Sequence, residues 1–221
     1  MDVQIHWTYI TPKKQEAFLV SDWVDAKKAL ALADDFEKTG RTKTVEFVDR
    51  NGTVWSKKEL KKLLEEIAGE PHEIVVYFDG GFDHETSQGG AGAVVYYKQN
   101  DHRYRLRANR KLDEIKSNNE AEYAAFWFVM QLLEELGVHH LPVTFRGDSH
   151  VVLKQLSGDW PCFEDDFNIW LDRIEAKMRE LGIEPAYEPI SRKQNKEADS
   201  LAQKALRGQI ITSRTELTEK G

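Results

Sequence analysis

The sequence predicts an α/β fold, in which a mixed five-stranded sheet is flanked by helices and preceded by a small α+β domain. Three strand-like segments follow one another from residue 73 onward. After them, helix and strand patterns alternate up to about residue 207. Consecutive strands followed by alternation are typical of a mixed sheet covered by helices. Residues 1–70 contain a separate set of strands and helices, which predicts a small domain of their own.

Composition limits the kind of protein this can be. The chain has 221 residues, of which 40% are hydrophobic and 31% are charged, as in ordinary globular proteins. No apolar run approaches the ~20 residues that a membrane helix needs, and the N-terminus lacks the layout of a signal peptide. The single cysteine, Cys162, excludes an intrachain disulfide. We therefore expect a cytoplasmic monomer that does not bind a membrane.

The net charge of −7 does not exclude a nucleic-acid partner, because the charge of the whole chain does not describe the local electric field at a binding site.

The N-terminal domain, residues 1–70, begins with two strand-like segments, VQIHWTYI and EAFLV, joined by a turn at Thr11–Lys14. A helix is predicted from Asp25, as N-cap, to Gly40, just past its end. The Asn51-Gly52 pair then predicts a hairpin. The amphipathic segment KKELKKLLEEIAGEP closes the domain as a helix that stops before Pro71.

The second domain, residues 73–207, opens with a predicted antiparallel meander. Its strands are Glu73–Asp79, Gly92–Lys98 and Arg103–Asn109, and the glycines after Asp79 are expected to end the first. The third strand carries alternating arginines, which we interpret as a solvated face. A long helix should follow from about Asn119. The remaining predicted elements are the strand LPVTFRGD, the short helix SHVVLKQLSG, the helix EDDFNIWLDRIEAKMREL, the strand IEPAYEPI and the helix NKEADSLAQKALRG. Residues 208–221 are predicted to be a frayed polar tail.

Two of the predicted strands end in an aspartate. Asp79 follows the apolar run IVVYF, and Asp148 closes the segment VTFRGD. If these strands are parallel and joined through the long helix by a right-handed crossover, both aspartates lie at the same edge of the sheet. Open sheets of this kind bind ligands at the carboxyl ends of their strands.

Two further acids are predicted near the starts of helices. Ser117 and Glu120 have the spacing of a capping box, so Glu122 falls in the first turns of a helix that is otherwise almost wholly apolar. Asp199 lies beside the apolar stripe of the last helix. Glu120 is interpreted as a structural acid of the helix start, and Glu197 as a solvated one.

Each of these acids, taken alone, has a structural explanation as a cap or a first-turn residue. Four together, on two strands and two helices, would need four coincidences. Clustered carboxylates repel one another unless cations neutralise them. Oxygen-only ligands favour Mg²⁺, with Mn²⁺ as a substitute.

The four motifs FDGG, SNNEAEY, RGDS and NKEADSLA, in this order, resemble type 1 ribonuclease H over residues 73–207. The resemblance implies a ribonuclease H-like fold, and the loop QLSGDW is similar to that of compact members without a basic protrusion. It implies hydrolysis of the RNA strand of RNA–DNA hybrids, with two metal ions per site. The catalytic and metal-binding residues would be Asp79, Glu122, Asp148 and Asp199. The implied substrate contacts are Gly80, Gly81, Asn118 and Asn119.

The chain departs from the family in two places. The loop before the last helix, EPISRKQN, has no histidine, and Arg192 and Lys193 are candidate phosphate-binding residues there. The N-terminal domain lacks the signature of a hybrid-binding domain, so its role and its partner stay open. Three alternatives remain: a binding protein of this fold with little or no turnover, a nuclease with another substrate, and a docking protein whose N-terminal domain presents Trp7, Trp23 or Trp55.

Overall fold

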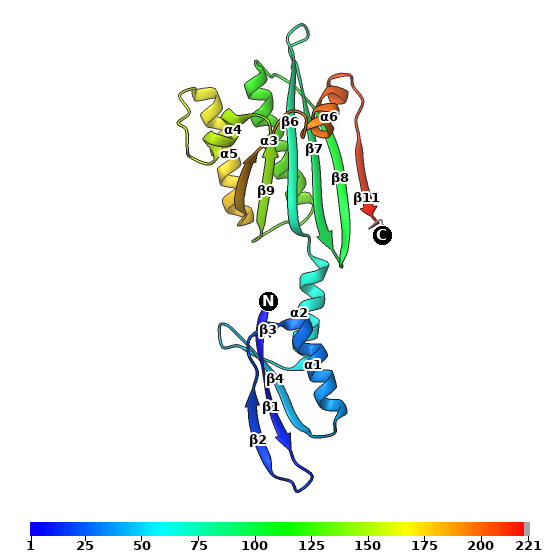
Figure 1. The fold of residues 1–221 in the computed structure, drawn as a ribbon. Helices are drawn as coiled ribbons and strands as arrows, with labels where there is room; N and C mark the ends of the chain where they lie inside the picture. Colours follow the sequence, from blue (N-terminus) through cyan, green and yellow to red (C-terminus); the bar gives the residue numbers. More distant parts are fainter. Residues whose placement is uncertain (219–221) are drawn as a thin grey trace. The chain divides into compact units, whose positions relative to one another are not determined.

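The computed structural model describes residues 1–218 and divides the chain into two compact units, Met1–Gly69 and Glu70–Gly221. Each unit has its own hydrophobic core. Figure 1 shows the ribbon of both. None of the helices within residues 1–218 has the length and apolar character needed to cross a lipid bilayer.

The N-terminal unit is a small sheet with two helices. Its strands pair in the order β2-β1-β4-β5, with β3 pairing with β1. The bounds are β1 Asp2–Ile10, β2 Glu16–Val20, β3 Val24–Asp25, α1 Ala26–Lys38, β4 Thr42–Asp49, β5 Val54–Trp55 and α2 Lys57–Gly69. Alternate residues of β1, Val3 and Ile5, are fully buried with Phe47 of β4 beneath the helices. The predicted strands, hairpin and helices of this unit are confirmed.

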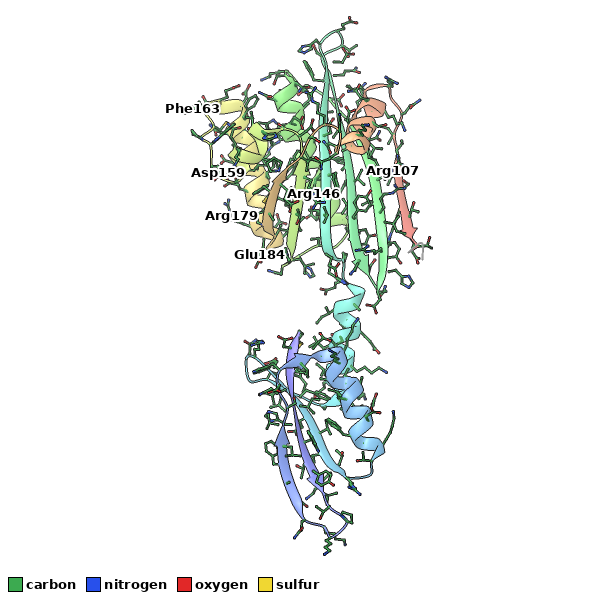
Figure 2. The ribbon with its side chains drawn as sticks, in the orientation of Figure 1. Arg107, Arg146, Asp159, Phe163, Arg179 and Glu184 are labelled. Carbon is green, nitrogen blue, oxygen red and sulfur yellow. The ribbon has the colours of Figure 1, made fainter. Side chains whose placement is uncertain are left out.

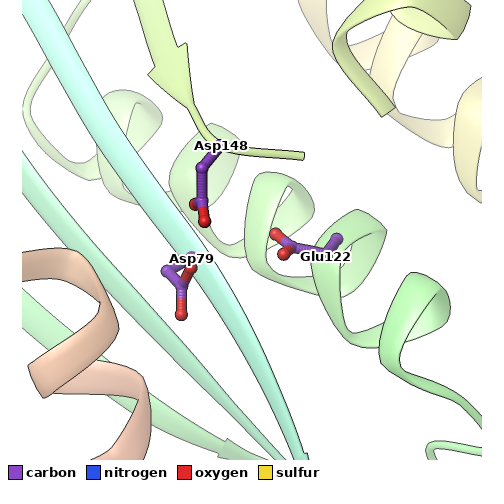
Figure 3. Close-up of side chains that lie close together, drawn as sticks. All are labelled: Asp79, Glu122 and Asp148. Atoms are coloured by element: carbon purple, nitrogen blue, oxygen red, sulfur yellow. The ribbon is translucent and has the colours of Figure 1, made fainter. Parts of the chain in front are cut away.

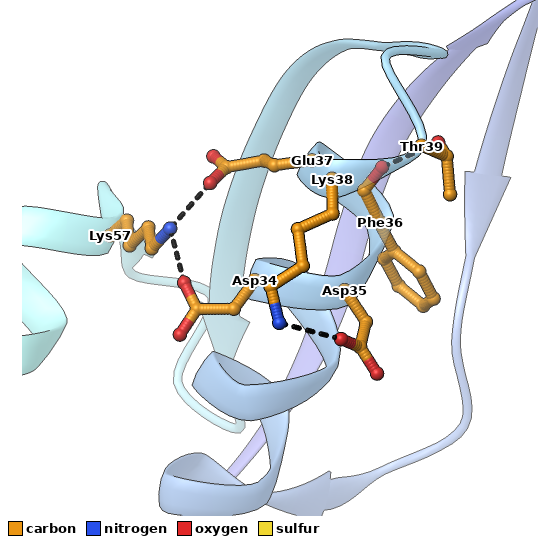
Figure 4. A network of polar contacts seen from close by, with 7 residues as sticks. All are labelled: Asp34, Asp35, Phe36, Glu37, Lys38, Thr39 and Lys57. Atoms are coloured by element: carbon orange, nitrogen blue, oxygen red, sulfur yellow. Dashed lines mark hydrogen bonds and ion pairs between the residues drawn. The ribbon is translucent and has the colours of Figure 1, made fainter.

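Capping and ion pairs fix the two N-terminal helices. The carboxylate of Asp25 accepts hydrogen bonds from the backbone amides of Lys27 and Lys28, which confirms it as the N-cap of α1. Lys57, the first residue of α2, contacts the carboxylates of Asp34 and Glu37 on α1 at 2.5 Å each. Figure 4 shows this lysine between the two acids.

The second unit is built on one six-stranded sheet. The strand order is β10-β9-β6-β7-β8-β11. Strands β6, β7 and β8 form the predicted antiparallel meander, while β9 runs parallel to both β6 and β10. The bounds are β6 His72–Asp83, β7 Gln88–Gln99, β8 His102–Leu112, α3 Asn118–Glu135, β9 Pro142–Gly147, α4 His150–Leu156, α5 Asp165–Leu181, β10 Glu184–Pro189, α6 Lys196–Leu206 and β11 Thr212–Leu217.

Helices α3 and α6 pack on opposite faces of this sheet. Phe78 of β6 meets Phe126 of α3 edge to face, whereas Gly92 of β7 faces the backbone of α6 at Ala198. Phe78 points toward α3. Because successive residues of a strand point to opposite faces, the next residue, Asp79, points to the face that α6 covers. Helix α5 packs against α3. The part of the sheet that carries Asp79 thus lies between two helices.

The structure corrects two predictions about this unit. Strand β6 does not end at the glycines but continues through Gly80 and Gly81 to Asp83, because both remain paired with β7. The segment after α6 is not wholly a polar tail: β11, Thr212–Leu217, pairs antiparallel with β8 and makes the sheet six-stranded rather than five-stranded. The polar sequence of β11 hid this strand, because an edge strand buries little of its surface.

Candidate metal centre

Asp79 lies within β6 and is buried, with 7% of its surface exposed. It pairs in register with Gly92 of β7, on the face of the sheet that α6 covers. The carboxylate is held inside the protein because Val76 and Phe78, on the other face of β6, pack in the main core. An ionised group in such a place needs a partner.

Glu122 reaches the same place from α3. The helix begins at Asn118, and the hydroxyl of Ser117 accepts from the amide of Glu120, which confirms the predicted cap. Gly80 is required here, since a Cβ at this position would lie 2.3 Å from the backbone of Ala121. The close approach lets the amide of Gly80 donate to Oε2 of Glu122 at 3.1 Å. This bond holds the glutamate beside Asp79.

Asp148 follows β9 directly and brings the third carboxylate. The parallel pairing of β9 with β6 confirms the predicted shared edge. Asp79, Glu122 and Asp148 each offer an oxygen, and these oxygens all lie within 4.8 Å of one another. Figure 3 shows the three side chains converging from two strands and a helix. Such a group of hard oxygen ligands suits a divalent cation.

Asp199 is outside this tight group. It lies in the first turn of α6 and is exposed. It nevertheless lines the same cavity as the other three acids, and its charge contributes to raising the pKa of Asp79. The structure therefore places the four predicted acids around one cavity and brings three of them within reach of a shared ion.

Burial and mutual repulsion act on the proton equilibria of two of these acids. Burial, followed by the charges of Asp148 and Asp199, raises the pKa of Asp79 from 3.8 to about 8. Burial and the neighbouring Asp79 and Asp148 raise the pKa of Glu122 well above its ordinary value. The described side chains around these acids thus carry too little positive charge to keep all of the carboxyl groups ionised. A bound cation would supply the missing charge.

The cavity at this centre measures about 290 Å³. Its lining includes most of the predicted site residues and two that were not predicted, Phe82 and Gln203. It is formed by Asp79, Gly80, Gly81, Phe82, Asn118, Glu122, Asp148, Arg192, Asp199 and Gln203. A larger cavity of about 430 Å³, near the start of β6, has one acid in its lining, Glu73, which is paired with Lys98 at 2.7 Å. The convergent acids therefore mark the smaller cavity as the candidate site.

The predicted basic and polar neighbours fall into two groups. The guanidinium of Arg192 is 93% exposed and lies 3.4 Å from the carboxylate of Asp148. Asn118 also lines the cavity. Asn119 and Lys193 are exposed and are not among the lining residues, so the structure does not bring them to the acids.

Sequence reasoning missed Asn195, which is 1% exposed. Its side-chain amide donates to Oδ1 of Asp148 at 2.7 Å and contacts Oδ1 of Asp79 at 3.4 Å. Asn195 is the first residue of the motif NKEADSLA, just before the last helix, and this position was the signal that could have identified it. It was assigned no role from the sequence.

The acids assigned no catalytic role behave differently from each other. Glu120 accepts from the backbone of Lys116 and from the indole of Trp170, as expected of a structural acid. Glu197 is not solvated as predicted: it pairs with Arg107 at 2.8 Å and Arg105 at 3.4 Å. These strand arginines, of which Figure 2 labels Arg107, are therefore neutralised in part by α6 rather than simply hydrated.

Comparison with known proteins identifies the family of the second unit. Residues 77–205, more than half of the chain, match the family described as reverse transcriptase-like. The chain belongs to this family. It is 45% identical to the uncharacterized protein YpeP of Bacillus subtilis (strain 168), over 93% of this chain and 90% of that protein. It is also 34% identical to ribonuclease HI of Halobacterium salinarum, over 41% of this chain and 44% of that enzyme.

Solved structures agree on the fold of this family member. Ribonuclease H1 of Halobacterium salinarum NRC-1 superposes with a TM-score of 0.52 at 24% identity, covering 61% of this chain and 98% of that one. LC11-RNase H1 in complex with an RNA/DNA hybrid gives 0.52 at 23% identity, covering 62% and 98%. The predicted resemblance to type 1 ribonuclease H, and the fold class that it implied, are confirmed.

Proposed function

We propose that the protein is a divalent-metal-dependent endoribonuclease that hydrolyses the RNA strand of RNA–DNA hybrids. The observation that carries this proposal is the convergence of Asp79, Glu122 and Asp148 within 4.8 Å, in a cavity that Asp199 also lines. A relative of the same fold is seen in complex with an RNA/DNA hybrid, which supports the choice of substrate.

The donor set fits hard divalent ions. Asp79, Glu122 and Asp148 would hold one ion through carboxylate oxygens, and Asp79 with Asp199 a second; Mg²⁺ is favoured, with Mn²⁺ as a substitute. When bound, such ions lower the pKa of a water nucleophile and stabilise the charge on the leaving oxygen. The raised pKa of Asp79 and Glu122 fits this assignment, since both acids lack a compensating charge of their own.

The residues of the chain would supply positioning and selectivity. Gly80 and Gly81 line the cavity, and Asn118 lies on its wall with an amide suited to a 2′-hydroxyl. Arg192, held near Asp148 and otherwise exposed, is placed to contact a phosphate. Selection of RNA over DNA would come from this polar wall. The site contains no histidine among its lining residues, so proton transfers would pass through water and the acids.

The test is cleavage of a labelled RNA–DNA hybrid by the purified protein in Mg²⁺ or Mn²⁺. Asp79→Asn removes a ligand without changing side-chain size, and we expect it to lower the cleavage rate at least about 100-fold, as loss of such a charge stabiliser typically does. Asp172→Asn, the same change at an exposed position on α5, is the matched control and should cleave like the wild type.

Two outcomes would contradict the proposal. Equal cleavage by the wild type and Asp79→Asn would show that the activity arises elsewhere. Tight binding of the hybrid without cleavage in either metal would favour a binding protein of the same fold.

A further inference from the structure

Asn195 has a fully buried amide side chain that hydrogen-bonds to an acid of the metal centre. Its backbone is fixed by the turn that leads into α6, where its amide donates to the carbonyls of Ser191 and Arg192. The same turn is tied to β9, because the amide of Ile190 donates to the carbonyl of Gly147. The side chain therefore projects from a firmly anchored position.

The side-chain amide of Asn195 has two N–H groups and faces three oxygens. It makes two short hydrogen bonds, to the carbonyl of Phe78 at 2.9 Å and to Oδ1 of Asp148 at 2.7 Å. The third contact, to Oδ1 of Asp79, is longer at 3.4 Å. Since Phe78 immediately precedes Asp79, the amide links the carboxylate after β9 to the point of β6 that carries the central aspartate.

The other end of the same amide is unsatisfied. Oδ1 of Asn195 is buried and has no hydrogen-bond partner among the described residues. Leaving a buried acceptor unpaired is costly, and packing alone would favour an apolar side chain here. The amide is thus oriented by its donors, because reversing it would set its oxygen against three others.

We propose that Asn195 is a positioning residue of the metal centre, which fixes the carboxylates of Asp79 and Asp148 at the separation that a divalent ion needs. This inference rests on the proposed function. Groups that hydrogen-bond metal ligands set the ligands' orientation, and their loss typically weakens metal affinity about 10- to 100-fold. In Asn195→Ala, the Asp148 carboxylate loses its short hydrogen bond to Asn195 and keeps the longer contact with the exposed Arg192.

A purely structural role must be separated from this one, because Asn195 also bonds the backbone of β6. Asn109 of β8 provides the matched control. It is also buried, and its amide donates to the carbonyls of Leu201 and Gln209, so it ties α6 to the sheet as Asn195 does. Both of these acceptors are backbone oxygens, and Asn109 does not line the metal cavity.

The experiment is titration of the folded full-length protein with Mn²⁺ by isothermal titration calorimetry, well below the melting temperature of each variant. We expect Asn195→Ala to raise the Kd at least about tenfold. Asn109→Ala should lower the melting temperature but leave the Kd within about twofold of the wild type. Asn195→Ser, which keeps one hydroxyl donor, should give an intermediate Kd and serves in place of the alanine variant should that variant not fold.

Each contrary result has a distinct meaning. A wild-type Kd in a folded Asn195 variant, with binding lost in Asp79→Asn, overturns the positioning role and leaves the proposed function standing. Equal weakening in the Asn195 and Asn109 variants also overturns it, because the effect would then come from general loosening of α6. Wild-type Mn²⁺ binding by Asp79→Asn removes the acidic cluster as the ion site and refutes the proposed function itself.

Discussion

At the scale of single residues, the acids of the metal centre are buried close together, and both burial and their mutual repulsion disfavour their ionised forms. Asp79 and Glu122 are each 7% exposed, and burial is the main cause of the raised pKa of both. Repulsion adds to it: the charges of Asp148 and Asp199 raise the pKa of Asp79, and those of Asp79 and Asp148 raise the pKa of Glu122. The hydrogen bond from Gly80 to Glu122 and the contacts of Asn195 offset only part of this repulsion. The apoprotein should therefore bear an electrostatic cost that depends on pH.

We predict that Asp79→Asn flattens the pH dependence of stability in the absence of metal. With a pKa of about 8 when folded, against 3.8 ordinarily, Asp79 retains a proton in the native state that the unfolded chain has lost. The free energy of unfolding should then fall as pH rises from about 4 to 8, by up to about 1.4 kcal/mol per pH unit. Urea unfolding in EDTA at pH 5, 6, 7 and 8 measures this slope.

The asparagine variant carries no charge at this position, so its slope should be smaller and its stability at pH 8 should exceed that of the wild type. Parallel stability curves for the two proteins would show that Asp79 is already ionised in the apoprotein at pH 5. Adding Mg²⁺ should stabilise the wild type more than the variant, because the ion binds the folded protein and the variant lacks one of its carboxylate ligands.

At the scale of elements, the site depends on how closely α6 approaches the sheet. Glycines of β7 make this approach possible: a Cβ on Gly92 would lie 2.1 Å from the carbonyl oxygen of Ala198, and one on Gly90 would lie 2.4 Å from that of Ala202. Small residues on the facing side of α6 complete the contact, with Ala198, Ala202 and Ala205 all buried. Helix α6 carries Asp199 and follows Asn195, so its depth sets the geometry of the acids.

We predict that Gly92→Ala displaces α6 and impairs the site. The added methyl group overlaps backbone atoms rather than a flexible side chain, so the helix must shift. The free energy of unfolding should fall by about 1–3 kcal/mol, as for other overpacked cores, and Mn²⁺ affinity should fall with it. Chemical denaturation and calorimetry on the same sample measure both. Unchanged stability would mean that the sheet and helix separate at little cost.

At the scale of the whole molecule, each of the two units has a hydrophobic core of its own. The core of the N-terminal unit consists of residues between Val3 and Leu60, and the main core of the second unit consists of residues from Ile74 to Ile183. The residues of the metal centre all belong to the second unit. Exposed apolar side chains of the N-terminal unit include Phe18 and Val54, at 65% and 55%.

We predict that a fragment of residues 70–221 folds alone and retains the cleavage rate of the full chain on a short RNA–DNA hybrid, within about threefold, since its core and acids are complete. Circular dichroism and the hybrid-cleavage assay test this. A folded fragment with a much lower rate at saturating substrate would assign the N-terminal unit a part in the reaction. An effect on KM alone would assign it a part in substrate binding.

From the sequence alone, the fold class, the order of the elements up to α6 and the acids around the cavity could be predicted. Those features follow from local patterns: an apolar strand that runs into Asp79, a capping box ahead of Glu122, and a parallel strand that ends at Asp148. Which of these groups lie together depends on how the elements pack. It left Asn119 and Lys193 away from the cavity, placed Asp199 outside the tight group of acids, and paired Glu197 with strand arginines.

Side chains converge according to the depth and register with which the elements pack, and no local sequence pattern encodes these. Gly80 reads as a strand terminator in sequence, yet it is the place where β6 and α3 touch. Asn195 reads as a polar residue before a helix, yet burial places its amide between two carboxylates. The polar β11 pairs with β8 at the edge of the sheet through its backbone, so its sequence carries little apolar pattern that would have revealed it.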